Sequence, residues 1–239
     1  MRTIIWYISF VVTLIGTLPQ LLKAKGLQKK GDFATYEAHI HRVAAKWMQG
    51  NIKRSGSTVE VKGIENVPQK DTVVFISNHQ GNFDIPLLMA YIDKPKGFIS
   101  KIEAKKIPIV ATWMEHLNCV FMDRSTLKGS AGAIFEGVKQ LKAGHSLVIF
   151  PEGTRSKGTK MGEFKSASFK LATKAGVPIV PVTIDGSYKI MENQNNWIKP
   201  SHVKLTIHPP IATKGLSKEE LEQIPNQVYK QIASALPNQ

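Results

Sequence analysis

Short runs of consecutive apolar residues, many of them β-branched, constrain the fold of this chain more than any other feature. Residues 73–76 are all apolar, so a strand formed there must be covered on both faces. Similar runs alternate with stretches of helical periodicity from about residue 57 onward. This alternation predicts an α/β fold with a mixed, largely parallel sheet that is covered by helices.

The sequence predicts seven strands and five helices in this region. The predicted strands are 58–61, 73–77, 97–100, 119–122, 146–150, 179–184 and 203–208. The predicted helices are 85–92, 108–117, 127–142, 166–175 and 218–235. The stretch 188–200 is mostly polar and is expected to form a loop.

The N-terminal stretch 3–22 contains no charged residue, and Arg2 precedes it. Its length just reaches the roughly 20 residues of a membrane-spanning helix, whereas Gly16 and Pro19 favour a helix that lies in the membrane interface. A cleaved signal peptide is disfavoured, because no small-x-small site follows the apolar part. Four lysines within residues 23–30 would keep the rest of the chain in the cytoplasm by the positive-inside rule.

Residues 33–49 predict a second N-terminal helix, with Asp32 as its N-cap and Gly50 as its end. Residues 1–50 hold seven basic and two acidic residues, and the apolar stripe of this helix includes Tyr36 and Trp47. These features suit a membrane surface, with packing against the protein core as the open alternative. We expect a membrane-docking two-helix segment at residues 1–50 and an α/β domain at residues 51–239.

The chain is strongly basic, with 32 Lys and Arg against 18 Asp and Glu and a net charge of +14. Such a charge points to anionic partners, namely nucleic acid, an acidic membrane leaflet, a phosphorylated substrate or an acidic carrier protein. The single cysteine excludes a disulfide framework and a cysteine-rich zinc or iron–sulfur site.

Two residues that could take part in catalysis follow the first long apolar run. His79 comes directly after the predicted strand 73–77, and Asp84 lies at the start of the next predicted helix. Ligands collect at the carboxyl ends of strands in such sheets. An imidazole there can act as a general base, and a carboxylate bonded to it fixes its tautomer. The alternative is a surface histidine beside an aspartate that caps a helix.

Two further strand ends carry polar residues. Glu152, Gly153, Thr154 and Arg155 follow the predicted strand 146–150, and Arg124 follows the predicted strand 119–122. Glycine permits a close backbone approach, and arginine suits an oxyanion. We expect these strand ends to meet at one rim of the sheet. The alternative for each arginine is a solvated surface charge.

Several known catalytic motifs are absent from the sequence. It contains no Gly-x-Ser-x-Gly nucleophile elbow and no Gly-x-Gly-x-x-Gly motif. The stretch 153–160 lacks the Gly-Lys-Ser/Thr order of a phosphate loop.

Four ordered blocks of sequence resemble those of the glycerolipid acyltransferase family. They are Asn78-His79-x4-Asp84, Phe121-Met122-Asp123-Arg124, the block 150–156 and the block 177–182. The resemblance covers roughly residues 55–211, and the two N-terminal helices are similar to the membrane-docking pair of some bacterial members. The chain departs from the pattern at Gly81, where the family often has serine, and at Asn118-Cys119, where the second block usually begins with glycine.

The resemblance implies that residues 51–239 form an acyltransferase domain. It would transfer an acyl chain from acyl-CoA or acyl carrier protein to the free sn-2 hydroxyl of 1-acyl-sn-glycerol 3-phosphate, making phosphatidic acid for phospholipid biosynthesis. His79 would take the hydroxyl proton, and Asp84 would orient His79. No metal or cofactor would be needed, because the thioester is a co-substrate.

The resemblance also implies the residues that bind substrate. The acceptor phosphate would lie near Lys101, Arg124 and Arg155. Glu152 and Gly153 would shape the acceptor pocket, and the Thr154 hydroxyl would bond the acceptor.

The expected partners are the lysophospholipid acceptor, the thioester donor and membrane lipid, without nucleic acid. The N-terminal segment would anchor the chain to the cytoplasmic face of the cell membrane. Two alternatives stay open. One is the same chemistry on another acceptor, such as glycerol 3-phosphate or another lysophospholipid. The other is a non-catalytic basic protein that binds a membrane surface or nucleic acid.

Overall fold

Side chains along the central strands alternate between two apolar cores. A computed structural model describes residues 1–237 of the chain. Val73 and Phe75 belong to one core and Val74 and Ile76 to the other, and all four are fully buried. Successive residues of a strand point to opposite faces. A strand that is apolar at every position therefore lies in a sheet with both faces covered, as the sequence predicts.

The sheet has seven strands in the order β1-β7-β6-β2-β5-β3-β4. Among the residues described, the β6–β7 pair is antiparallel and the other neighbours are parallel. The strands are β1 Thr58–Lys62, β2 Val74–Ser77, β3 Lys96–Lys101, β4 Val120–Met122, β5 Ser146–Ile149, β6 Ile179–Asp185 and β7 His202–Ile207. The predicted mixed, largely parallel sheet is confirmed, and each strand end lies within one residue of its prediction.

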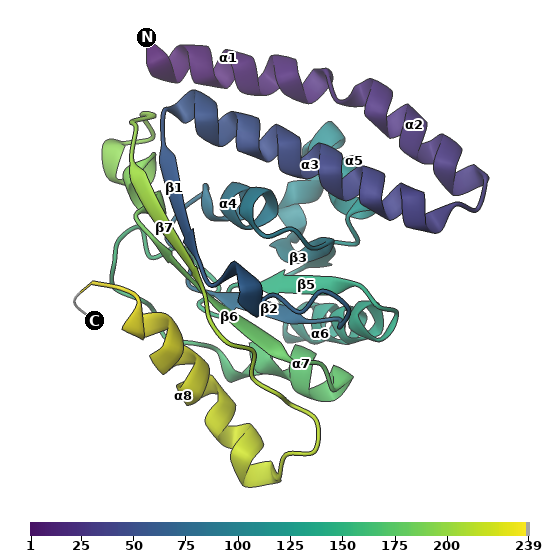
Figure 1. The fold of residues 1–239 in the computed structure, drawn as a ribbon, viewed down its shortest axis with the longest axis vertical. Coiled ribbons are helices and arrows are strands. Elements are labelled where there is room, and N and C mark those ends of the chain that lie inside the picture. Colours follow the sequence, from purple (N-terminus) through teal and green to yellow (C-terminus); the bar gives the residue numbers. More distant parts are fainter. Residues whose placement is uncertain (238–239) are drawn as a thin grey trace.

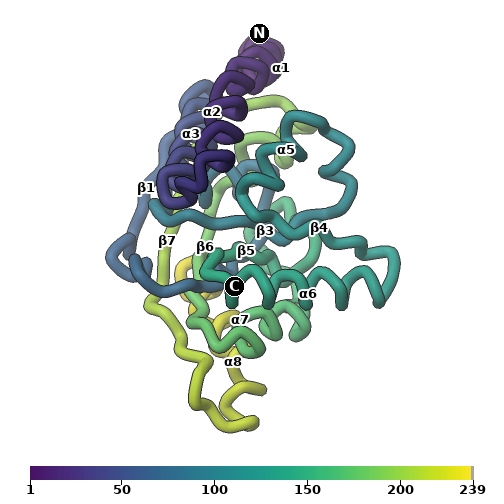
Figure 2. Tube along the Cα trace, turned by 90° about the vertical axis from the view of Figure 1, so that its right-hand side faces the viewer, coloured from purple at the N-terminus to yellow at the C-terminus, as the bar shows by residue number. Residues whose placement is uncertain are grey.

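Helices cover both faces of this sheet (Figure 1). The helices are α1 Arg2–Ile15, α2 Leu18–Lys29, α3 Phe33–Ser55, α4 Asp84–Tyr91, α5 Pro108–His116, α6 Leu127–Lys142, α7 Lys170–Ala175 and α8 Lys218–Ser234. Helices α3 and α4 contribute to the core on one face, and α6, α7 and α8 to the core on the other. Figure 2 shows α1, α2 and α3 together at one end of the molecule and α8 toward the opposite end.

Two predicted segments have a different local structure. The predicted helix 166–175 begins as the 3-10 helix η3 Ser166–Phe169 and continues as α7. The stretch 188–200 contains most of η4 Ser187–Lys189 and the whole of η5 Glu192–Gln194. Ile190, Met191 and Ile198 of this stretch are buried, so it packs against the domain.

Helix α3 runs past Gly50, so the predicted end of this helix is wrong. Asp32 does cap its N-terminus, with the carboxylate accepting a hydrogen bond from Thr35 N at 3.2 Å. The helix continues because Ile52 is fully buried in the core, and this burial outweighs the roughly 1 kcal/mol that glycine costs inside a helix. It ends at Gly56, whose φ of 82° is left-handed.

The apolar N-terminal stretch forms α1 and the start of α2, with a break at Gly16 and Thr17. The N-terminal segment therefore has three helices, α1, α2 and α3, where the sequence predicts two. Pro19 lies in the first turn of α2, where a missing N–H costs no helical hydrogen bond. Within residues 1–237, Arg2–Lys29 is the one helical stretch that is long and apolar enough to cross a membrane.

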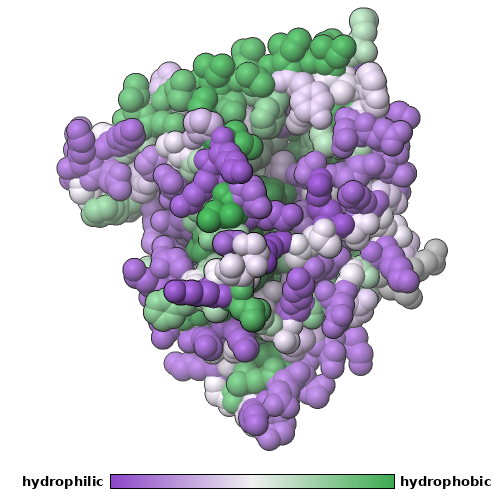
Figure 3. Space-filling view, turned by 180° about the vertical axis from the view of Figure 1, so that it is seen from behind, coloured by the Kyte–Doolittle hydropathy of each residue, from purple (hydrophilic) through white to green (hydrophobic). Residues whose placement is uncertain are grey.

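Helix α1 packs on α3 with one side only. Trp6 Nε1 donates to Asn51 O at 2.9 Å, and the rings of Phe10 and Trp47 lie 4.9 Å apart. The opposite side of α1 is exposed and apolar, and it forms a continuous row along one edge of the molecule (Figure 3). We call this row the α1 apolar face; its residues are Ile4, Ile5, Tyr7, Ile8, Val11, Val12 and Ile15. Exposed apolar patches of this kind mark contact with lipid or with another protein.

Lys96, the first residue of β3, has a buried ammonium group. Its Nζ donates to the carbonyl oxygens of Ile92 at 2.7 Å and Lys94 at 3.0 Å. Burial lowers the pKa of Lys96 from 10.5 to about 7, although the charge of Asp93 opposes this shift. Between these two pH values the unfolded chain binds one proton that the folded chain does not. We therefore expect the free energy of unfolding to rise with pH above 7, by up to about 1.4 kcal/mol per pH unit from this group.

Urea unfolding of detergent-solubilised protein between pH 6 and 9 measures this effect. Lys96→Met should lack that part of the rise, because methionine carries no titrating group. Lys128, exposed on α6, provides the control, and Lys128→Met should keep the wild-type pH dependence. The same slope in Lys96→Met and wild type would contradict the prediction.

Candidate active site

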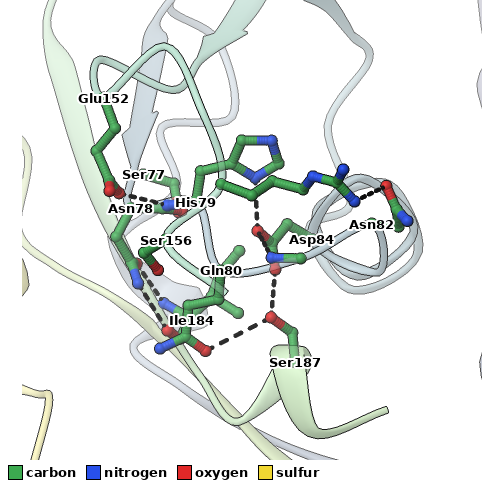
Figure 4. A network of polar contacts seen from close by, with 12 residues as sticks. Ser77, Asn78, His79, Gln80, Asn82, Asp84, Glu152, Ser156, Ile184 and Ser187 are labelled. Carbon is green, nitrogen blue, oxygen red and sulfur yellow. Dashed lines mark hydrogen bonds and ion pairs between the residues drawn. The ribbon is translucent and has the colours of Figure 1, made fainter. Parts of the chain in front are cut away.

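The turn between β2 and α4 brings His79 and Asp84 together. His79 Nδ1 lies 2.7 Å from Asp84 Oδ2. Because a carboxylate only accepts, Nδ1 carries the proton and Nε2 is free to take another. Asp84 is fully buried and accepts two more hydrogen bonds, from Gly81 N at 2.8 Å and from the Ser187 hydroxyl. Figure 4 shows His79, Asp84 and Ser187 joined in sequence by these bonds.

The His79 ring is also held by an aromatic neighbour. Phe150, which follows β5, stacks on it with ring centroids 4.1 Å apart and an angle of 17° between the planes. The imidazole is therefore fixed by a carboxylate at Nδ1 and by an apolar ring against one face. Its side chain remains 17% exposed, so a small group can reach it.

Glu152 lies behind the turn that carries His79. Its Oε1 accepts from His79 N at 2.7 Å, and its Oε2 accepts from Gly162 N at 2.8 Å. Burial raises the pKa of Glu152, and the two backbone N–H donors oppose that shift. The side chain therefore braces the ends of β2 and β5 against each other, as Figure 4 shows for its bond to His79.

A cavity of about 360 Å³ opens at this edge of the sheet. Six of the eight predicted site residues line it together, and Asp84 and Glu152 lie buried outside its lining. The lining residues predicted from sequence are His79, Lys101, Arg124, Gly153, Thr154 and Arg155. The expectation that the strand ends meet at one rim of the sheet is met.

The cavity is strongly positive. Lys101, Arg124, Arg155 and Lys157 line it, and no acidic residue within the described part of the chain does so. Arg124 Nη1 donates to the carbonyl oxygen of Gly153, which ties the ends of β4 and β5 together. Such a site attracts an anion with several oxygens, and a phosphate fits the planar fork of arginine.

Some residues at or beside the cavity are not predicted by the sequence analysis, among them three that are charged or bond a predicted residue. Lys157 lines the cavity, Ser187 bonds Asp84, and Glu192 forms an ion pair with Arg155 at 3.0 Å. Ser187 follows the end of β6, so the rule that polar residues gather at strand ends would have found it. Glu192 has no such signal, because it lies in a stretch that reads as a loop.

This geometry suits removal of a proton from a hydroxyl group on an anionic substrate. The free Nε2 of His79 is able to act as a base, and Asp84 would stabilise the imidazolium that forms. The four cationic side chains provide the anion site on the same cavity.

The acyltransferase family model matches residues 58–185 of the chain. This region is more than half of the chain and contains His79, Asp84, Glu152 and Arg155. The chain belongs to the acyltransferase family, as the four sequence blocks predict.

Relatives from a plant and a bacterium are both named 1-acyl-sn-glycerol-3-phosphate acyltransferase. The chloroplastic 1-acyl-sn-glycerol-3-phosphate acyltransferase of Brassica napus is 36% identical over 182 residues, which cover 75% of this chain and 52% of the plant protein. The 1-acyl-sn-glycerol-3-phosphate acyltransferase of Borreliella burgdorferi is 31% identical over 183 residues, which cover 76% of this chain and 73% of that protein. The chain thus spans about half the length of the plant relatives it matches.

A solved structure is similar over nearly the whole chain. It is the crystal structure of the 1-acyl-sn-glycerophosphate (LPA) acyltransferase PlsC from Thermotoga maritima. The TM-score is 0.87 at 30% sequence identity, and the match covers 98% of this chain and 92% of that one. The similarity therefore includes the N-terminal helices as well as the sheet.

Proposed function

We propose that this chain is a 1-acylglycerol-3-phosphate O-acyltransferase. It transfers an acyl chain from an acyl thioester to the sn-2 hydroxyl of 1-acyl-sn-glycerol 3-phosphate, and the product is phosphatidic acid for phospholipid biosynthesis. The observation that carries the proposal is one cavity that joins the His79–Asp84 pair to four cationic side chains. The names of the relatives support the same reaction.

The proposed reaction is a direct acyl transfer. His79 Nε2 takes the proton of the acceptor hydroxyl while that oxygen attacks the thioester carbonyl carbon. The tetrahedral intermediate then collapses, its carbon–sulfur bond breaks, and the thiolate takes the proton from the imidazolium. Asp84 accepts from Nδ1–H throughout, so it holds the ring in one tautomer and stabilises its positive form.

The cationic side chains would bind the acceptor phosphate. Arg124 and Arg155 offer planar donors, Lys101 and Lys157 add positive charge, and all four line the cavity. The exposed Thr154 hydroxyl on the same wall would bond the glycerol backbone. Glu152 would act from behind, by holding the His79 turn in place.

Residues 1–50 would seat this acyltransferase domain, residues 51–239, on the cytoplasmic face of the cell membrane. The α1 apolar face is exposed, and lysines follow it within residues 23–30. An apolar face flanked by cations suits insertion into an anionic leaflet. The lysophospholipid acceptor lies in that leaflet, so an enzyme held there meets its substrate without waiting for it to dissociate.

The first test of this proposal concerns the catalytic pair. His79→Ala should lower kcat by about 10²- to 10⁴-fold because the general base is lost. Asp84→Asn should lower it nearly as much because the tautomer is no longer fixed. Turnover of lysophosphatidic acid is measured in mixed micelles, with acyl-CoA as the donor in one series and acylated acyl carrier protein in the other. His202→Ala, at an exposed site on β7, is the control, and near-normal turnover by folded His79→Ala would contradict the assignment.

The second test concerns the phosphate. Arg155→Ala and Arg124→Ala should each raise the KM for the acceptor by roughly 10- to 100-fold, since a charged hydrogen bond is lost. The KM for the donor should change far less. Arg155→Lys should stay impaired, because a lysine does not reproduce a bidentate contact. The control is Lys214→Ala, at an exposed site before α8, and equal effects on both KM values would refute the assignment.

The third test concerns the membrane. The double variant Ile8→Glu/Val12→Glu places charges on the α1 apolar face, where both side chains are about three-fifths exposed. It should weaken binding to vesicles with anionic lipid by roughly ten-fold or more, because apolar burial is lost and charge is introduced. Vesicle flotation measures the bound fraction. Ile64→Glu, at an exposed apolar residue outside α1, should bind like wild type. Unchanged binding of the double variant would show that another surface makes the contact.

A further inference from the structure

Glu192 lies outside the four sequence blocks and outside the segment that the family model matches. It comes from η5 Glu192–Gln194, in the segment that follows β6. Its side chain is only 2% exposed, although a carboxylate is rarely buried unless it is paired. The hydrogen-bond partners of the Glu192 carboxylate therefore indicate why it is buried.

The Glu192 carboxylate joins two segments of the candidate site. Its Oε1 accepts from Asn82 N at 2.7 Å and from Arg155 Nη1 at 3.0 Å. Arg155 Nη1 also donates to Asn82 Oδ1 at 2.6 Å. The guanidinium is thus held on one side by the Glu192 carboxylate of η5 and by the Asn82 amide of the turn after β2.

Arg155 has hydrogen-bond donors that its contacts within residues 1–237 do not use. Within residues 1–237 its hydrogen bonds all use Nη1, and arginine has five N–H donors in a rigid plane. The same side chain lines the cavity. A guanidinium fixed at one nitrogen and open at the others is prepared for two-point contact with a phosphate.

Gly81 is explained by the same carboxylate. A Cβ placed on Gly81 would lie 2.5 Å from Glu192 Oε2, and the three nearest heavy atoms beyond its chain neighbours all belong to the Glu192 carboxylate. The φ of Gly81 is not left-handed, so the backbone does not require glycine there. Glycine instead leaves the space that the Glu192 carboxylate occupies, and a larger residue would have to displace that carboxylate.

Burial of the Glu192 carboxylate destabilises the folded state at one of its two oxygens. Glu192 Oε2 is buried without a hydrogen-bond partner among the described residues. An unsatisfied buried oxygen is unfavourable, and it calls for a functional reason. Orientation of Arg155 supplies that reason, because a flexible side chain that is ordered in advance loses less entropy when it binds its ligand.

We infer that Glu192 is a positioning residue for the acceptor phosphate, and that it acts by fixing the Arg155 guanidinium. Gly81 belongs to the same device, because it leaves room for the carboxylate. The inference rests on the proposed acyl transfer to a phosphorylated acceptor.

Steady-state kinetics with lysophosphatidic acid test the inference. Glu192→Gln keeps the shape of the side chain and removes its charge. It should raise the acceptor KM by roughly 3- to 10-fold, the range expected when one side chain loses its prior order. The kcat and the donor KM should stay near wild type. Glu222→Gln, at an exposed site on α8, is the matched control and should change neither KM.

A double-mutant cycle separates this role from a general loss of structure. Gly81→Ala should displace the carboxylate and raise the acceptor KM about as much as Glu192→Gln does. In a Glu192→Ala background, Gly81→Ala should have no further effect, because nothing remains to displace. Such non-additivity is expected for residues that are in contact, whereas independent sites give additive effects.

Three outcomes of these kinetic measurements would overturn the inference. Additive effects of Gly81→Ala and Glu192→Ala would overturn the inference, and so would an unchanged acceptor KM in Glu192→Gln. A fall in kcat with similar rises in both KM values would also overturn it, since that pattern indicates a structural role alone. Failure of the wild-type protein to acylate lysophosphatidic acid would contradict the proposed function first and the inference with it.

Discussion

The buried carboxylate of Asp84 is the constraint on which the site depends. It is fully buried, so its oxygens need donors from inside the protein. The donors are His79 Nδ1, Gly81 N and the Ser187 hydroxyl. The first two fold the turn after β2 back onto the start of α4. The third draws the segment after β6 to the same point, so one buried carboxylate brings together His79 and the ends of two strands.

A second buried carboxylate extends this arrangement to β5. Glu152 accepts from His79 N and Gly162 N, while Ser156 N donates to His79 O at 2.7 Å. The turns after β2 and β5 are therefore bonded to each other in both directions. Because neighbouring parallel strands end at one edge of the sheet, these short bonds are available without any distortion of the strands. The positive cavity forms in front of them.

The sequence predicts the parts of this protein that obey local rules. The strands are predicted well because a run such as 73–76 is short, apolar at every position and rich in β-branched residues, as is typical of a sheet covered on both faces. The placement of His79, Asp84 and Arg155 at one edge of the sheet is predicted because strand ends collect ligands. The end of α3 is missed because burial of Ile52, a tertiary effect, outweighs the local signal of Gly50. Glu192 is missed because its partners are distant in sequence and its own stretch is mostly polar.

Helix α1 and the turn that carries His79 are coupled through direct side-chain contacts. Trp6, on the packed side of α1, lies with its ring centroid 5.5 Å from that of Phe83, the residue before Asp84. Trp6 Nε1 also bonds Asn51 O on α3, so α1 cannot rotate about its axis without breaking both contacts. The direction in which the apolar face points is therefore fixed relative to His79. If that face enters the lipid leaflet, as we propose, the same contacts set the orientation of the cavity toward the headgroups.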